Sequence, residues 1–371
     1  MENFDEAIDR TRTSSVKWDK YANRDILPMW VADMDFRSPS QIVEALEHRV
    51  EHGVFGYTHA PLDLIETVVA MLEAEYGWKV GMDSIVWLPG LVSGLNIACR
   101  AASGGVLTTI PVYPPFLSAP HNSGYPLSTS PLVFENNRWG HDFDDLKDAV
   151  RPETRLFLLC NPHNPTGRIM ERSELEKIAL LCDEHDLFIC SDEIHCGLLL
   201  DGEKRHVPIA SLAPEIEKRT ITLMAPSKTF NIPGLAVSFA VIPNQELRRR
   251  FEAVMAGIVP HVNALGYTAA LVAYRDCNAW RRKLIDYLAA NRDLVEREIP
   301  AMGLSMAHVE ATYLAWIDAR PIDDPARFFE MAGIGLSDGT DFGSPGFVRL
   351  NFGCPRWRLE DALSRMKNAL R

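Results

Sequence analysis

Short apolar runs alternate with amphipathic stretches through the middle of the chain. The runs are rich in β-branched residues and are bounded by Gly, Pro or Asn, which is typical of buried strands. The predicted strands are Ile85–Leu88, Gly105–Ile110, Leu156–Leu159, Leu187–Cys190, Thr220–Leu223 and Leu235–Val241. The predicted helices between them are Gly94–Ala102, Asp142–Val150 and Arg172–Glu184. Strands that alternate with helices predict a mainly parallel sheet covered by helices on both faces.

The pattern changes toward both ends of the chain. After the predicted sheet we expect a long helix that Pro300 ends, followed by a mixture of strands and helices. These elements are Ala279–Ile299 (helix), Thr312–Ile317 (strand), Pro325–Met331 (helix), Phe347–Asn351 (strand) and Arg358–Leu370 (helix). The sequence therefore predicts an α/β protein. Its large domain would span residues 46–285, and a smaller α+β domain would combine residues 1–45 with residues 286–371.

Charge and composition narrow the function classes. The 371 residues include 38 basic and 50 acidic side chains, a net charge of −12, which argues against a nucleic-acid or membrane-surface partner. Apolar runs such as Leu235–Ile242 are far shorter than the ~18 residues that span a bilayer, and the acidic N-terminus does not resemble a secretory signal. The seven cysteines are scattered without CxxC spacing. We therefore expect a cytoplasmic protein without a metal site.

Candidate chemistry follows the predicted strands, because ligands of parallel sheets bind beyond the carboxyl ends of the strands. Residues Pro89–Gly94 open a helix whose free N–H groups favour an anion such as phosphate, although an ordinary helix start has the same pattern. Tyr113 lies among prolines that hold its backbone extended. Its ring is either a platform for a flat ligand or a packed loop aromatic.

Two charged residues that follow predicted buried strands favour a specific ligand. Asp192 requires a cation, which is either a structural partner or part of a cofactor. Lys228 is either an ordinary surface lysine or a buried amine with a lowered pKa, which is the condition for a nucleophile. Together with the polar turn Asn161–Arg168, a phosphate site and an aromatic platform, they describe one ligand. It has a phosphate, a hydroxylated ring, a basic ring nitrogen and an aldehyde, as pyridoxal 5′-phosphate (PLP) does.

Three motifs resemble those of fold-type I PLP enzymes of the class I/II aminotransferase superfamily. They are Asn161–Arg168 (NPHNPTGR), Ser191–His195 (SDEIH) and Ser227–Gly234 (SKTFNIPG). The separations 192 − 164 = 28 and 228 − 192 = 36 are usual for the superfamily. Four further segments are similar to MalY/PatB-type cystathionine β-lyases, also called cysteine-S-conjugate β-lyases. They are Leu27–Phe36 (LPMWVADMDF), Phe55–Tyr57 (FGY), Thr312–Asp318 (TYLAWID) and Val348–Pro355 (VRLNFGCP).

The resemblance implies the fold-type I transferase fold and a role for each matching residue. Lys228 would bond the cofactor aldehyde and then move the Cα proton of the substrate. Asp192 would keep the pyridine nitrogen protonated, and Asn164 would hydrogen-bond the phenolic oxygen. Tyr113 would stack on the ring and contact the substrate. The residues implied to hold the phosphate are Gly90, Leu91, Val92 and Ser227.

Further implied roles concern the substrate and a second subunit. Arg349 would bind the substrate α-carboxylate through a bidentate pair. Tyr57 would reach the phosphate and substrate of the neighbouring subunit, so a homodimer is expected. His195 replaces the tyrosine that many aminotransferases aim at the ring hydroxyl. Ala236 and Ala225 stand where many relatives have an arginine and a serine, and Ala225 puts one phosphate contact in doubt.

The function expected from this resemblance is α,β-elimination on an L-cysteine thioether, which gives a thiol, pyruvate and ammonia. An aminotransferase shares the first steps, because the difference depends on fine positioning of the lysine and the leaving group. A regulatory protein that keeps the cofactor and acts by binding a partner is a third hypothesis. A nicotinamide-dependent dehydrogenase is disfavoured, since no GxGxxG motif follows an early strand.

Overall fold

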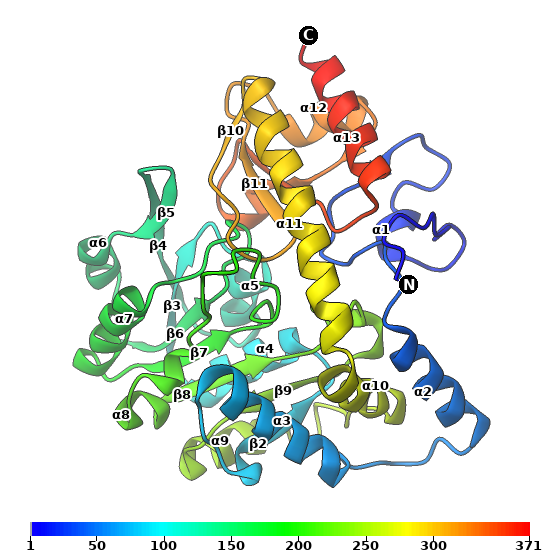
Figure 1. Ribbon diagram of the computed structural model, residues 1–371. Helices are drawn as coiled ribbons and strands as arrows, with labels where there is room; N and C mark the ends of the chain where they lie inside the picture. Colours follow the sequence, from blue (N-terminus) through cyan, green and yellow to red (C-terminus); the bar gives the residue numbers. More distant parts are fainter. Residues whose placement is uncertain (1) are drawn as a thin grey trace.

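The computed structural model describes residues 2–371. An eight-stranded sheet lies at its centre, in the order β2-β9-β8-β7-β6-β3-β4-β5 (Figure 1). Strands β8, β7, β6, β3 and β4 are parallel to one another, whereas β2, β9 and β5 join through antiparallel pairs. The predicted mainly parallel sheet is therefore confirmed. The strands are β2 (Ile85–Leu88), β3 (Gly105–Ile110), β4 (Leu127–Glu135), β5 (Arg138–His141), β6 (Thr154–Cys160), β7 (Phe188–Asp192), β8 (Thr220–Met224) and β9 (Ser238–Val241).

Helices cover both faces of this sheet, and successive residues of each strand point to opposite faces. Leu156 and Leu158 of β6 pack with α4 (Leu91–Ala102), α5 (Pro115–Asn122) and α9 (Gln245–Met255). Phe157 and Leu159 pack on the other face with α6 (Phe143–Asp148) and α7 (Arg172–Glu184). Helices α3 (Leu62–Tyr76) and α10 (Ala264–Asp276) cover that second face beside β9. The sheet is thus buried on both sides, which explains its continuous apolar strands.

A smaller antiparallel sheet, in the order β10-β11-β14-β13, lies beside the large one. Its strands are β10 (Ser305–Met306), β11 (Leu314–Asp318), β13 (Ser337–Asp338) and β14 (Phe347–Asn351). Helices α11 (Asn278–Ala301), α12 (Pro325–Met331) and α13 (Arg356–Ala369) accompany it. The short strand β1 (Leu27–Pro28) pairs in parallel with β12 (Ile334–Gly335), so an N-terminal segment of the chain lies beside a C-terminal one.

Two sequence expectations need correction, and one hairpin is an addition to them. Helix α11 includes Pro300 and ends at Ala301. Its end is closed by hydrogen bonds that span three residues, from the N–H groups of Met302 and Gly303 to the carbonyls of Ile299 and Pro300. Strand β9 begins only at Ser238, since Pro233–Leu235 forms a 3₁₀ turn. The hairpin β4–β5 was not predicted, and its turn consists of two asparagines with positive φ, Asn136 and Asn137.

No helix among residues 2–371 has the length and apolar character that crossing a membrane requires.

Candidate active site

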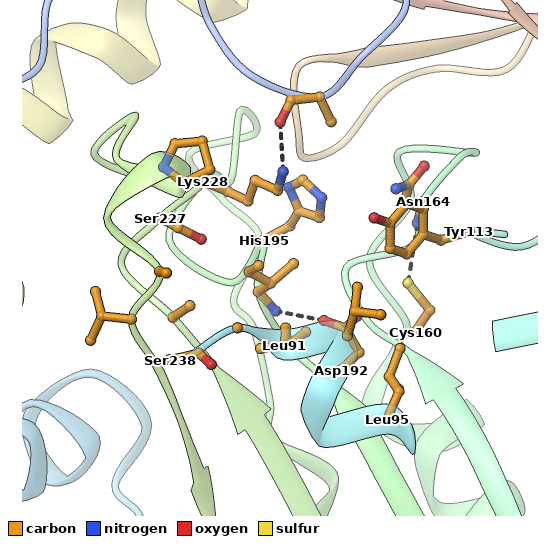
Figure 2. A pocket seen from close by; sticks show the side chains of 18 of the residues that line it. Leu91, Leu95, Tyr113, Cys160, Asn164, Asp192, His195, Ser227, Lys228 and Ser238 are labelled. Carbon is orange, nitrogen blue, oxygen red and sulfur yellow. Dashed lines mark hydrogen bonds between the residues drawn. The ribbon is translucent and has the colours of Figure 1, made fainter. Parts of the chain in front are cut away.

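A cavity of about 160 Å³ opens at the carboxyl ends of β7 and β8 (Figure 2). Asp192 is the last residue of β7, and Lys228 follows β8. Because β7 and β8 are parallel neighbours with Asp192 opposite Leu223, both side chains enter at the same edge of the sheet. The sequence-predicted residues that line this cavity are Gly90, Leu91, Val92, Tyr113, Asn164, Asp192, His195, Ser227 and Lys228.

The start of α4 forms one wall of the cavity. Its first N–H groups have no partner within the helix, and no acidic side chain occupies the first turn. Gly94 allows this close approach, since a Cβ there would lie 2.9 Å from a methyl of Leu223 and 3.0 Å from one of Leu88. The helix start can therefore face an anion at the edge of the sheet.

Lys228 is half-buried, and its Nζ donates a hydrogen bond to the carbonyl oxygen of Ala32 at 2.6 Å. The pKa of Lys228 is lowered to about 8, chiefly by burial and also by the nearby positive charge of Arg349. The carboxylates of Asp33 and Asp192 act in the opposite direction. The amine is thus partly neutral near neutral pH, as a nucleophile or a base requires.

Asp192 is also buried, and burial raises its pKa to about 7. One carboxylate oxygen accepts a hydrogen bond from the N–H of Ile194 at 3.1 Å. No ion pair joins Asp192 to a basic side chain among residues 2–371. A buried carboxylate without a cationic partner in its own chain fits a ligand that brings an N–H⁺ group.

Arg349 lies in an adjoining cavity of about 680 Å³, which shares Ala32, Tyr113 and Lys228 with the first. Its guanidinium donates to Asn164 Oδ1 at 2.8 Å and to the Trp30 carbonyl at 2.9 Å. Its Nε has no partner in the described chain. Arg349 and Lys228 therefore both line this wider cavity.

Tyr113 and His195 lie on opposite sides of the cavity (Figure 2). The backbone N–H of Tyr113 donates to the Asn164 carbonyl at 3.1 Å, which ties two of the site's loops together. His195 is buried, and burial holds its pKa well below the usual range, so its ring is neutral. Its Nδ1 has no partner in the described chain, and its ring meets Tyr313 edge to face at 6.0 Å.

Tyr57 is the one predicted residue that lies outside both cavities. Its side chain is fully exposed, and it borders a separate hollow with Pro260–Leu265. Sequence reasoning missed Ala32, Tyr313 and the Asn164–Arg349 hydrogen bond. Ala32 contributes through its backbone, so its side chain carries no signal, whereas Tyr313 lies within a quoted motif, Thr312–Asp318.

Comparison with known proteins identifies the family of this chain. Residues 25–366 match the family described as "Aminotransferase class I and II". Cystathionine beta-lyase PatB of Bacillus subtilis (strain 168) is 39% identical, over 99% of this chain and 100% of that protein. The crystal structure of OvoB has a TM-score of 0.97 at 48% identity, covering 99% of both chains. Cystalysin from Treponema denticola, crystallised with PLP, has a TM-score of 0.95 at 30% identity, covering 100% of this chain and 99% of that one. The chain belongs to the class I and II aminotransferase family, and the resemblance to PatB-type proteins is confirmed.

Proposed function

We propose that this protein is a PLP-dependent carbon–sulfur β-lyase. It would cleave L-cystathionine or related L-cysteine S-conjugates to a thiol, pyruvate and ammonia. The observation that carries this proposal is that an amine with a lowered pKa, Lys228, and a buried carboxylate, Asp192, line one cavity at the edge of the sheet. The full-length similarity to a protein named cystathionine beta-lyase supports the choice of reaction.

The residues of the cavity fit PLP, which supplies an aldehyde that reacts with amines and a ring that accepts electrons. Asp192, which lacks a cationic partner in the described chain, would hold the protonated ring nitrogen. The start of α4 at Leu91 and Val92, with Gly90 and Ser227, would hold the phosphate. Tyr113 would stack on the ring.

The substrate would be oriented by Arg349 and deprotonated by Lys228. The planar guanidinium matches a carboxylate, and its position beside Asn164 and Trp30 is fixed by hydrogen bonds. The neutral amine of Lys228 can accept the Cα proton. The adjoining cavity of about 680 Å³ leaves room for the sulfur substituent.

We further propose a cytoplasmic homodimer, in which Tyr57 of the partner subunit completes each site. Support comes from the exposure of Tyr57 together with its neighbours Val54 and Phe55, because clustered exposed apolar side chains mark interaction surfaces. All seven cysteines are free thiols, which is usual in a reducing compartment.

The reaction is tested with L-cystathionine in the absence of any oxo-acid. We expect pyruvate from the wild type and a loss on the order of 10³-fold or more in Lys228→Ala, because the variant lacks both nucleophile and base. Lys147→Ala, which removes an exposed lysine of α6, is the control and should leave the rate unchanged. Pyruvate release that requires an oxo-acid acceptor would instead identify an aminotransferase.

A further inference from the structure

The carbonyl oxygen of Ala32 accepts hydrogen bonds from two side chains that are distant in the sequence. Lys228 Nζ donates at 2.6 Å, and the hydroxyl of Tyr313 donates at 2.9 Å. Figure 2 shows the lysine amine reaching upward from its loop to this carbonyl. The N-terminal segment, the loop after β8 and the residue before β11 thus meet at one oxygen atom.

The segment around Ala32 is held rigidly by side chains. Every carbonyl from residue 30 to residue 34 accepts at least one side-chain hydrogen bond. Arg349 donates to the Trp30 carbonyl, and the amide of Asn351 donates to the carbonyls on both sides of Ala32 at 2.6 and 2.7 Å. We name residues 30–34 the carbonyl strap. Because its neighbours are fixed, the Ala32 oxygen has a defined position.

A buried ion cluster anchors the end of the carbonyl strap. The fully buried carboxylate of Asp35 pairs with Lys17 and Arg358, each at 3.0 Å, and with Arg10 at 2.7 Å. These cations hold the pKa of Asp35 at about 2 despite its burial, so the cluster stays charged at neutral pH.

Tyr313 has no role in the chemistry described so far. It is 1% exposed, and the Ala32 carbonyl is the hydrogen-bond acceptor of its hydroxyl in the described chain. Its ring packs edge to face against His195, which fixes the direction of the hydroxyl. A hydroxyl this deeply buried needs a hydrogen-bond partner. If the position served packing alone, phenylalanine would fill it equally well without that requirement.

We infer that Tyr313, acting through the Ala32 carbonyl, is a positioning residue for the free amine of Lys228. This inference rests on the proposed function. A neutral amine has two N–H donors and one lone pair, so one N–H held by the Ala32 oxygen restricts where the lone pair points. When the lone pair accepts the Cα proton, the electron pair of the broken C–H bond stays with the substrate. The new ammonium continues to donate to the same oxygen.

The test uses Tyr313→Phe, which removes the hydroxyl and keeps the ring. The first readout is exchange of the Cα proton of L-alanine in D₂O, followed by NMR. L-alanine has no leaving group at Cβ, so exchange reports proton transfer whether or not the protein is a lyase. We expect kcat for exchange to fall on the order of tenfold, with KM changed less than about twofold, because the amine is misplaced while Arg349 is untouched.

The second readout does not depend on turnover. The full-length protein is stripped of cofactor, and the rate at which added PLP restores the visible absorption band is measured. This rate requires the Lys228 amine to be presented to the aldehyde. We expect slower recovery in Tyr313→Phe, with the same final absorbance.

Tyr287→Phe is the matched control, because it also removes a tyrosine hydroxyl that donates to an acceptor, Asp5, and neither residue lines the cavity. It should match the wild type in both readouts. Wild-type rates in Tyr313→Phe, or equal losses in both variants, would overturn the inference. Proton exchange without pyruvate from L-cystathionine would overturn the lyase proposal alone.

Discussion

At the scale of single residues, burial brings the pKa values of two ionisable groups closer together. It raises the pKa of Asp192 to about 7 and lowers that of Lys228 to about 8. Both shifts have the same cause, since burial penalises the charged form of each group. A carboxylate and an amine that are fully charged in water thus become able to exchange protons near neutral pH, as acid–base catalysis requires.

The raised pKa of Asp192 makes stability depend on pH in the cofactor-free protein. The folded state holds this proton more tightly than the unfolded state, so the stabilisation is complete below about pH 4 and is lost as the pH rises through about 7. We expect the free energy of unfolding of the wild type, relative to Asp192→Asn, to fall across this range. The fall is about 1.4 kcal/mol for each unit of pKa difference. Urea unfolding of both proteins at several pH values measures it.

The comparison with Asp192→Asn matters because other groups titrate in the same range. Burial lowers the pKa of His163 to about 3 and of His141 to about 4, which makes stability rise with pH as these histidines lose their protons. Those contributions are common to both proteins and cancel in the difference. A difference that stays constant from pH 4 to pH 7 would show that folding does not raise the pKa of Asp192.

Residues whose chemistry follows from local sequence could be placed without a structure. Asp192 ends an apolar strand and Lys228 follows the next one, so the sequence alone predicted that both reach one edge of the sheet. The hydrogen bond between Asn164 and Arg349 joins residues 185 positions apart, and no local pattern encodes it. The role of Tyr313 was hidden for the same reason, because its partner lies 281 positions away.

At the scale of elements, the central strands were predictable because they are buried on both faces. Their continuous β-branched runs contrast with the polar connections between them. Strand β4 lies toward the edge of the sheet. Its alternating exposed residues and its internal Pro131 interrupt the apolar run by which the central strands were predicted. The end of α11 was misjudged because proline removes a hydrogen bond but does not stop a helix that closes within one turn.

The close packing of helix α4 on the sheet can be tested by mutation. A side chain at Gly94 would meet methyl groups of Leu223 and Leu88, so Gly94→Val should push the helix start away from the sheet. We expect a destabilisation of about 1–3 kcal/mol and weaker PLP binding, measured by urea unfolding and by titration of visible absorbance. Gly140→Val is the control, since a Cβ there meets nothing within 4 Å. Equal PLP affinity in both variants would show that α4 does not form the phosphate site.

At the scale of the whole molecule, the site is assembled from both ends of the chain. The N-terminal segment supplies the carbonyl strap, the central sheet supplies Asp192 and Lys228, and β14 supplies Arg349. Strand β1 pairs with β12, and this pairing brings an N-terminal segment beside a C-terminal one. The smaller cavity contains every sequence-predicted site residue except Arg349, which lines the adjoining cavity, and Tyr57, which lies outside both.

The proposed dimer predicts that two inactive variants complement each other. Tyr57→Ala and Lys228→Ala should each be impaired alone. In a hybrid dimer, one site would combine an intact Lys228 with the intact Tyr57 of the partner subunit. Co-expression in equal amounts should therefore restore about a quarter of wild-type activity, because half of the dimers are hybrids with one working site. Pyruvate release from purified mixed dimers measures this.

The control pair is Lys228→Ala with Asn164→Ala, whose residues line the cavity of the same subunit. No hybrid dimer of this pair contains a complete site, so activity should not return. Equal recovery in both pairs would show that Tyr57 does not act across the subunit interface.

The carbonyl strap also bears on how this protein can be engineered. Ala32 meets Lys228 and Tyr313 through a main-chain oxygen that every amino acid possesses. Alanine scanning would pass over this position, and a library that varies its side chain would leave the oxygen in place. Mutagenesis aimed at this contact must instead change the donor Tyr313, or change Asn351, which holds the carbonyls on both sides of Ala32. A third route replaces the peptide bond by an ester, which weakens the carbonyl as an acceptor. A backbone atom would then be the tunable part of the site.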